Sequence, residues 1–80
     1  MSQSEKEKYD GIFITCFGVT ADQLPGLTYQ SIPSWDSVGH MGMVAELEDA
    51  FDIMLEMDDI IDFSSYEEGI KILKKYGIEI

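Results

Sequence analysis

A serine with an aspartate directly before it, Asp36-Ser37, stands at the start of the longest amphipathic stretch of the chain. Asp36 or Ser37 could cap a helix, because a short oxygen side chain accepts a hydrogen bond from an amide of the first turn. The serine could also act as a nucleophile, or its hydroxyl could hold a covalently attached group. A cap explains part of the pattern and an attachment site explains more, because acidic residues also line the turns that follow.

A nucleophilic serine needs a neighbouring base and a group that orients the base. The only histidine, His40, follows Ser37 by three residues and is therefore near it on a helix. No partner arrangement or oxyanion loop is evident, so we interpret His40 as a surface or rim residue and expect no enzymatic activity from the chain itself. Cys16, the only cysteine, lies among Phe13 and Phe17 and is interpreted as a small core residue.

Metal binding fits the sequence poorly despite its many acidic residues. A calcium loop starting at Asp58 needs Asp or Asn at its third position and Gly at its sixth, where this chain has Ile60 and Phe63. Zinc sites need cysteines and histidines that the chain lacks. We therefore expect no metal site. No glycine-rich loop that could bind phosphate is present either.

The charge of the chain is strongly acidic, with 16 Asp and Glu against 5 Lys and a formal net charge of −11. All the lysines lie near the two ends, and residues 9–70 contain neither Lys nor Arg. This distribution argues against binding to nucleic acid or to an anionic membrane surface, and it speeds encounter with basic proteins.

The same composition bears on compartment and assembly. A single cysteine excludes an internal disulfide, and we find no secretory signal and no apolar run of membrane-spanning length. We expect a cytoplasmic, reducing location. With no second cysteine and no long apolar stripe, we expect a monomer.

The periodicity predicts one all-α domain over residues 1–80, a small four-helix bundle of three main helices and one short helix. Residues 9–17 have helical spacing and Gly18 is a helix stop, while residues 1–8 are expected to be frayed or a first turn. A long loop, 19–35, follows. Further helices are expected at 36–52, around 58–63 and at 66–75, the last capped by Ser64 or Ser65. The apolar residues expected to pin the loop are Leu24, Leu27, Tyr29, Ile32 and Trp35.

The helix at 36–52 has two distinct faces on a helical wheel. The predicted core face consists of Met43, Val44, Leu47, Ala50 and Phe51. Val38, Met41 and Ala45 fall instead among acidic residues, on the side of Ser37. Such a mixed face is typical of a docking surface for a basic, partly apolar partner, although isolated apolar surface residues are also common. In the last helix, Ile70 and Leu73 are the predicted core residues.

The segment SIPSWDSVGHMGMVAELEDAF resembles the core signature of acyl carrier proteins, and the resemblance extends over nearly the whole chain. It implies that the Ser37 hydroxyl receives 4′-phosphopantetheine from coenzyme A through a phosphopantetheinyl transferase. The thiol of that arm would hold an acyl group as a thioester. The resemblance also implies that acyl-loading and acyl-processing enzymes dock on one face, made of Asp36, Val38, Met41, Ala45, Glu48 and Asp49.

Some residues depart from the family pattern. Val38 replaces the usual leucine, and Gly39 and Gly42 are each expected to weaken the helix by about 1 kcal/mol relative to Ala. Gly42 stands where carriers of fatty acid synthesis commonly have an acidic residue. YQSIPSWDSVGHM is more similar to free-standing specialised carriers, so fatty acid, polyketide and other acyl cargoes stay open. Two alternatives are an aminoacyl or peptidyl carrier and an acidic helical interaction module in which Ser37 is only a cap.

Overall fold

Five helices form the secondary structure of residues 4–80, the part of the chain that the computed structural model describes, and no strand occurs there. Their bounds are α1 Glu5–Phe17, the 3₁₀ helix η1 Ala21–Gly26, α2 Ser37–Phe51, α3 Met57–Asp62 and α4 Tyr66–Lys75. The predicted all-α bundle with three main helices and one short helix is confirmed. The difference is η1, which lies inside the segment predicted as an irregular loop.

The first helix begins four residues before the apolar periodicity does. Ser4 caps it, since the Ser4 hydroxyl accepts a hydrogen bond from the Glu7 N–H at 3.1 Å and the Glu7 carboxylate reaches back to the Ser4 N–H. Of the two expectations for residues 1–8, the first-turn alternative therefore holds for residues 4–8, and residues 1–3 lie outside the described residues. The helix ends as predicted at Gly18, whose φ of 66° is left-handed.

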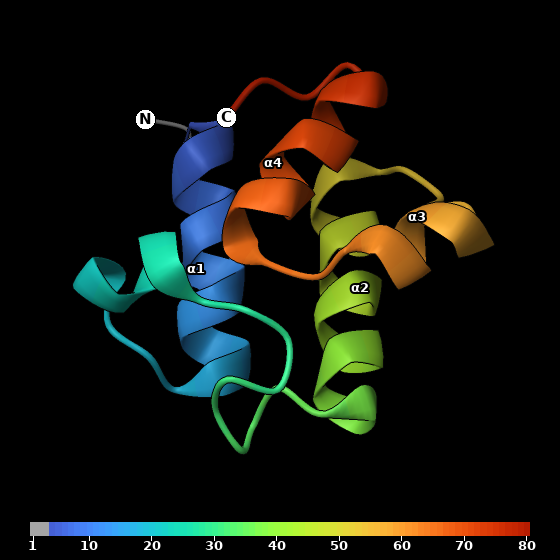
Figure 1. Cartoon of the computed structure of the whole chain (residues 1–80). Coiled ribbons are helices and arrows are strands. Elements are labelled where there is room, and N and C mark those ends of the chain that lie inside the picture. Colours follow the sequence, from blue (N-terminus) through green and yellow to red (C-terminus); the bar gives the residue numbers. More distant parts are fainter. Residues whose placement is uncertain (1–3) are drawn as a thin grey trace.

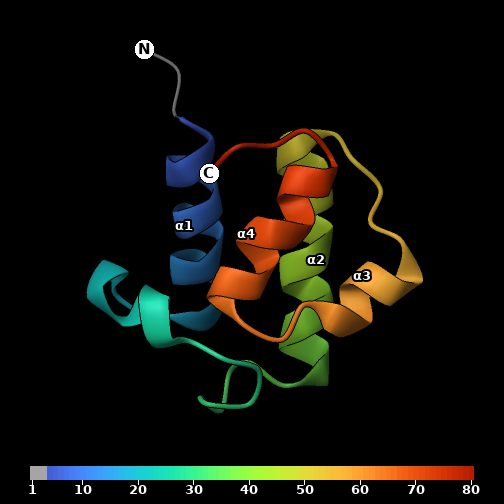
Figure 2. The same ribbon diagram turned by 45° about the horizontal axis from the view of Figure 1, so that its top comes forward.

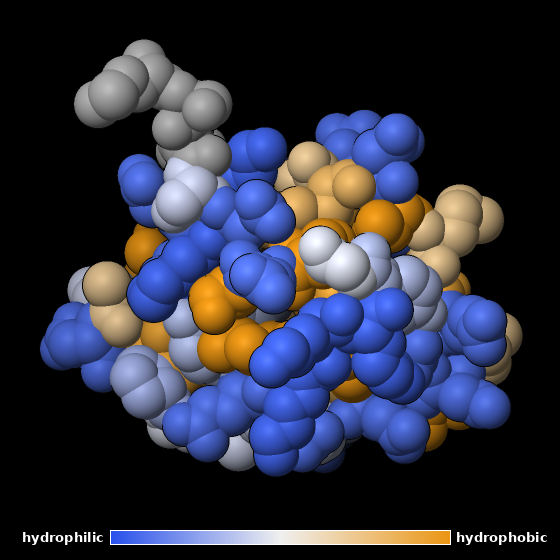
Figure 3. Space-filling view, turned by 90° about the horizontal axis from the view of Figure 1, so that it is seen from above, coloured by the Kyte–Doolittle hydropathy of each residue, from blue (hydrophilic) through white to orange (hydrophobic). Residues whose placement is uncertain are grey.

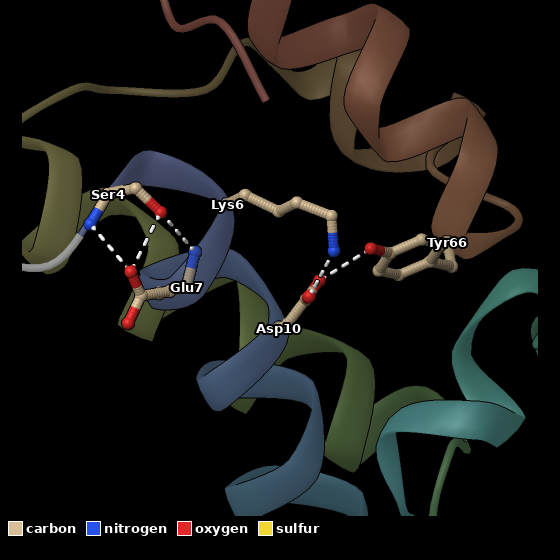
Figure 4. A network of polar contacts seen from close by, with 5 residues as sticks. All are labelled: Ser4, Lys6, Glu7, Asp10 and Tyr66. Atoms are coloured by element: carbon tan, nitrogen blue, oxygen red, sulfur yellow. Dashed lines mark hydrogen bonds and ion pairs between the residues drawn. The ribbon is translucent and has the colours of Figure 1, made fainter.

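Polar side chains on α1 also tie it to α4 (Figure 4). The Tyr66 hydroxyl donates to one carboxylate oxygen of Asp10, and the Lys6 ammonium donates to the other at 2.6 Å. The Tyr9 hydroxyl, buried nearby, donates to the Tyr66 carbonyl at 2.6 Å. The two tyrosine bonds join residues 56 and 57 positions apart in the chain and satisfy both tyrosine hydroxyls.

Helices α1, α2 and α4 lie side by side, with α2 and α4 running opposite to α1 (Figures 1 and 2). The short helix α3 lies at the side of this group, beside α2. The connection between η1 and α2 crosses the end of the bundle at which α2 begins. Figure 3 looks onto the opposite end, where hydrophilic residues cover most of the face and hydrophobic residues show between them.

Aromatic side chains dominate the core between the helices. Phe13 lies at the centre, with its ring centroid 5.5 Å from Trp35 and 6.2 Å from Phe63. Trp35 also stacks on Phe17 at 5.0 Å. The fully buried large side chains are Trp35, Tyr9, Phe13, Phe63, Leu24, Met43, Leu47, Leu73 and Val44. A chain of this size buries little surface per residue, so a few large rings supply much of the apolar burial.

The predicted core faces are mostly confirmed, with one correction in the main helices. In α2, Met43, Val44 and Leu47 are buried and Phe51 is half-buried, but the prediction for Ala50 is wrong. Ala50 lies at the edge of the core face, where it lines an open groove between α1 and α2.

In α4, Leu73 is buried as predicted, and Ile70 is half-buried and packs against the core. Ile72 is buried as well, together with Tyr66 and Gly69, so the core face of α4 is wider than the predicted one. A methyl group at Gly69 would overlap the Phe63 ring and the Tyr9 hydroxyl.

The apolar residues expected to hold the long loop against the core are buried or half-buried, except for Tyr29. Leu24, Leu27 and Trp35 are buried and Ile32 is half-buried, but the side chain of Tyr29 is exposed. The backbone of this segment pairs with the start of α4, since the Tyr29 N–H donates to the Ser64 carbonyl at 2.8 Å. Tyr29 is therefore held through its backbone, and its ring is left at the surface.

Two glycines in α2 make a matched test of this packing. A methyl group at Gly39 would overlap the Ser34 carbonyl oxygen, whereas nothing lies within 4 Å of one at Gly42. We expect Gly39→Ala to lower the free energy of unfolding by about 1–3 kcal/mol, because a backbone atom has to shift. Gly42→Ala should raise it by up to about 1 kcal/mol. Urea denaturation measures both, and equal effects of the two substitutions would contradict this account.

Candidate functional site

The start of α2 shows which of two candidate residues caps the helix. The Asp36 carboxylate accepts a hydrogen bond from the Gly39 N–H at 2.8 Å, so Asp36 is the cap. Ser37 is the first residue of the helix, and its side chain is exposed. The helix therefore does not need the Ser37 hydroxyl for capping.

The turn before α2 holds this serine in a defined place. The Ser34 hydroxyl donates to the Phe17 carbonyl at 2.9 Å, and the Gln30 N–H donates to the Trp35 carbonyl at 2.9 Å. The Trp35 side chain, fully buried, anchors the segment in the aromatic core. An exposed hydroxyl is thus attached to a backbone that is fixed two residues earlier.

His40 has a structural role that the sequence did not indicate. The Trp35 indole N–H donates to His40 Nδ1 at 3.0 Å, and His40 Nε2 lies 2.8 Å from the Ile60 carbonyl oxygen. Because Nδ1 accepts a bond, the neutral ring carries its proton on Nε2 and donates it to that carbonyl. The prediction of a surface or rim residue agrees with the half-buried state of His40, but it missed that His40 connects the long loop, α2 and α3.

These two bonds also bear on chemistry at Ser37. A histidine that acts as a general base needs a free ring nitrogen directed at the serine hydroxyl. Both nitrogens of His40 are already bonded to other groups, Trp35 and Ile60. His40 therefore does not form a catalytic pair with Ser37 in this arrangement.

An apolar cavity of about 380 Å³ opens beside Ser37, between α2 and α3. Its lining residues are Tyr29, Ser37, His40, Met41, Met57, Ile60, Ile61, Phe63 and Ser64. Met41 is 54% exposed, Met57 71% and Ile61 69%, so large apolar side chains surround the opening. An exposed hydroxyl therefore lies on the rim of a cavity suited to an apolar group.

Most of the docking face expected from the sequence is exposed, and Met41 joins it to the cavity. Val38 is 80% exposed and Met41, Ala45, Asp36 and Asp49 are exposed as well. Glu48 differs, because it is half-buried and its carboxylate accepts a hydrogen bond from the Leu55 N–H at 2.9 Å. Glu48 thus fixes the connection that leaves α2 and is less available to a partner than its neighbours.

The other side of α3 is fastened by a polar cluster that sequence reasoning missed. Asp59 is buried and accepts hydrogen bonds from the Lys75 ammonium and the Tyr76 hydroxyl, each at 2.5 Å. The Tyr76 hydroxyl in turn accepts one from the Glu56 N–H at 3.0 Å. The bonds from Lys75 and Tyr76 lower the pKa of the Asp59 carboxyl. Nothing in the sequence distinguishes Asp59 from the exposed Asp58 beside it.

Cys16 lies away from the Ser37 site, in the groove between α1 and α2. Its side chain is half-buried and packs against the core, in agreement with its interpretation as a small core residue. Burial, together with the nearby Glu46 carboxylate, raises the pKa of the thiol. A protonated thiol is a poor nucleophile.

No protein-family model matches this chain, and no curated protein matches it. Within residues 4–80, His, Cys, Asp and Glu side chains form no group of three or more that could hold a metal ion. In the same part of the chain, no helix has the length and apolar character needed to span a membrane.

The bridge through His40 gives a prediction for stability. We expect His40→Ala to lower the free energy of unfolding by about 1–3 kcal/mol, because it leaves the buried Trp35 indole N–H without an acceptor. Met41→Ala removes an exposed side chain from the next position and should stay within about 0.5 kcal/mol of the parent. Trp35 is the only tryptophan, so its fluorescence during urea denaturation reports both transitions. Equal stability of the two variants would contradict the bridge.

The Asp59 cluster gives a prediction for pH. Because the folded-state pKa of Asp59 is lowered, its stabilising effect is present above its unfolded pKa of about 3.8 and is lost as pH falls through the folded-state value. Asp59→Asn should therefore reduce the free energy of unfolding at neutral pH, and its difference from the parent should shrink below about pH 4. Urea denaturation at several pH values measures this.

The matched control is Asp58→Asn, a change at the exposed neighbouring position. It should leave stability nearly unchanged or raise it slightly, because it removes one charge from a strongly acidic protein. If the difference between Asp59→Asn and the parent stayed constant down to strong acid, the ionised Asp59 would not be the stabilising group.

Proposed function

We propose that this protein is an acyl carrier protein that carries 4′-phosphopantetheine on Ser37. The observation that supports this most is the position of the Ser37 hydroxyl. It is exposed at the first turn of α2, is not needed for capping and lies on the rim of an apolar cavity. The resemblance of residues 31–51 to the acyl carrier signature points to the same residue.

The surroundings of Ser37 suit a phosphodiester. The first amides of α2, those of Ser37 and Val38, have no intrahelical partner, as in any helix, and the helix dipole is positive at this end. This favours an exposed anionic group by about 0.3–1 kcal/mol. The Asp36 carboxylate, although adjacent, is bonded to the Gly39 N–H, which partly offsets its repulsion of a phosphate.

In this proposal the residues of the chain position and shelter the attached group. Phosphopantetheine, when attached, supplies a flexible arm whose terminal thiol holds an acyl group as a thioester. Trp35 fixes the backbone that presents Ser37, and the cavity between α2 and α3 offers apolar surface close to it. The protein itself performs no catalytic step and acts as a substrate of its partner enzymes.

The partners fit the exposed face of α2. Asp36 and Asp49 provide negative charge there, while Val38, Met41 and Ala45 provide apolar contact. A phosphopantetheinyl transferase and acyl-processing enzymes with a basic, partly apolar surface match this face in charge and character. Glu48, expected in the same set, contributes through the backbone that it fixes.

The character of the cavity favours an acyl over an aminoacyl cargo. An aminoacyl group carries an ammonium, which has to be paired or solvated when it is sheltered. No carboxylate is among the residues that line the cavity. The alternative of a non-covalent interaction module gave Ser37 only the role of a helix cap, and in the structure Asp36 has that role.

Alanine substitutions of two serines at helix starts distinguish attachment of the cofactor from capping of the helix. We expect Ser37→Ala to abolish the addition of one phosphopantetheine, measured as intact mass after incubation with coenzyme A, Mg²⁺ and a broad-specificity phosphopantetheinyl transferase. Its free energy of unfolding should change little, because Asp36 is the cap. Ser4→Ala should keep the full mass increase while losing about 1 kcal/mol of stability, because Ser4 caps α1.

The result that would overturn the proposal is equally direct. It would be an unmodified parent protein, in a reaction where the same transferase modifies a known carrier. Mass addition to Ser37→Ala would instead place the attachment on another residue.

A further inference from the structure

Three rings form one wall of the cavity beside Ser37: Phe63, which is buried, His40, which is half-buried, and Tyr29, which is exposed. The centroid of His40 lies 5.4 Å from that of Tyr29 and 6.0 Å from that of Phe63, with both pairs close to perpendicular. Behind the wall, Trp35 stacks on His40 at 6.2 Å. Aromatic rings therefore lie between the cavity and the core.

Hydrogen bonds hold this wall in place. His40 accepts from the Trp35 indole N–H and donates to the Ile60 carbonyl, so moving it would leave a fully buried indole N–H without an acceptor. Phe63 is buried as well and stacks on Phe13. An acyl chain that entered between α2 and α3 would have to break these hydrogen bonds and displace the packed rings.

The outer part of the cavity is adaptable by comparison. Met41 and Met57 line it, are largely exposed and have flexible side chains that adjust to different shapes. A protein cavity of about 150 Å³ already holds a benzene molecule. The 380 Å³ available here is enough for a small acyl group, and a longer acyl chain could continue towards the core only by displacing the His40 and Phe63 rings.

We propose, on the basis of the function proposed above, that the cargo is a short-chain or aromatic acyl group seated against His40 and Phe63. In this proposal His40 is the residue that limits cargo length. A short acyl group lies in the cavity, so that apolar surface of the acyl group and of the cavity is removed from water. The distal part of a long acyl chain stays in solvent.

The test compares the protein carrying a free phosphopantetheine thiol with the protein carrying butanoyl, benzoyl or tetradecanoyl phosphopantetheine. The transferase attaches each group from the corresponding coenzyme A thioester, and intact mass verifies loading. We expect butanoyl and benzoyl to raise the thermal midpoint by about 4 °C, and tetradecanoyl to give no larger rise. The methyl signals of Met41 and Met57 in NMR spectra should shift with the two small cargoes.

A variant pair tests the role of His40. In His40→Ala the wall is opened, and tetradecanoyl should raise the midpoint more than butanoyl does, each relative to the same variant with the free thiol. Met54→Ala, at an exposed position on the connection between α2 and α3 and outside the cavity, should keep the parent order. The series on the parent protein decides the cargo-length proposal even if His40→Ala does not fold.

The outcomes separate this inference from the proposed function. If neither phosphopantetheine nor any of its acyl forms attaches to the parent protein, the proposed carrier function itself is overturned. Loading followed by a midpoint that climbs steadily up to tetradecanoyl overturns only the short-cargo inference. Loading with no effect of any cargo on the midpoint or the methyl signals also overturns it, because nothing is then sheltered.

Discussion

The contact on which the site depends most is the hydrogen-bonded bridge from Trp35 through His40 to Ile60. The tryptophan is fully buried and fixes the loop, the histidine belongs to α2, and the carbonyl belongs to α3. One imidazole thus joins the three segments that surround Ser37. Because a buried indole N–H is costly to leave unpaired, the bridge stabilises this one arrangement against looser alternatives.

A second polar cluster completes the attachment of α3. This helix has only six residues, so it cannot be stable through its own hydrogen bonds. The His40 bridge holds α3 at Ile60 on one side, and Asp59 with Lys75 and Tyr76 holds it on the other. The cavity wall that α3 supplies is therefore positioned by tertiary contacts.

The acidic composition has opposite consequences for stability and for function. A net charge of −11 on 80 residues repels itself, and the few lysines lie near the ends of the chain. Two of them neutralise carboxylates at packed positions, Lys6 at Asp10 and Lys75 at Asp59. The acidic face of α2 has no such partner nearby in sequence, which leaves its negative potential available to a basic protein.

The amino-acid sequence by itself determined the helix content and the place of the candidate serine. Apolar spacing predicts α1, α2 and α4, because side-chain periodicity decides where helices form. Gly18 marks the end of α1 and Ser64 or Ser65 the start of α4, and in the structure Ser65 is the cap. The exposure of Ser37 and Val38 follows from the same helical wheel.

The tertiary structure alone decided what lies around that serine. The sequence treats Gly39 and Gly42 alike, but only Gly39 is pressed against a carbonyl, that of Ser34. The sequence does not indicate that His40 is hydrogen-bonded at both ring nitrogens, or that Asp59 is buried while Asp58 is exposed. These differences depend on contacts between residues 5 to 20 positions apart, which periodicity cannot report because it records only how each segment repeats along itself.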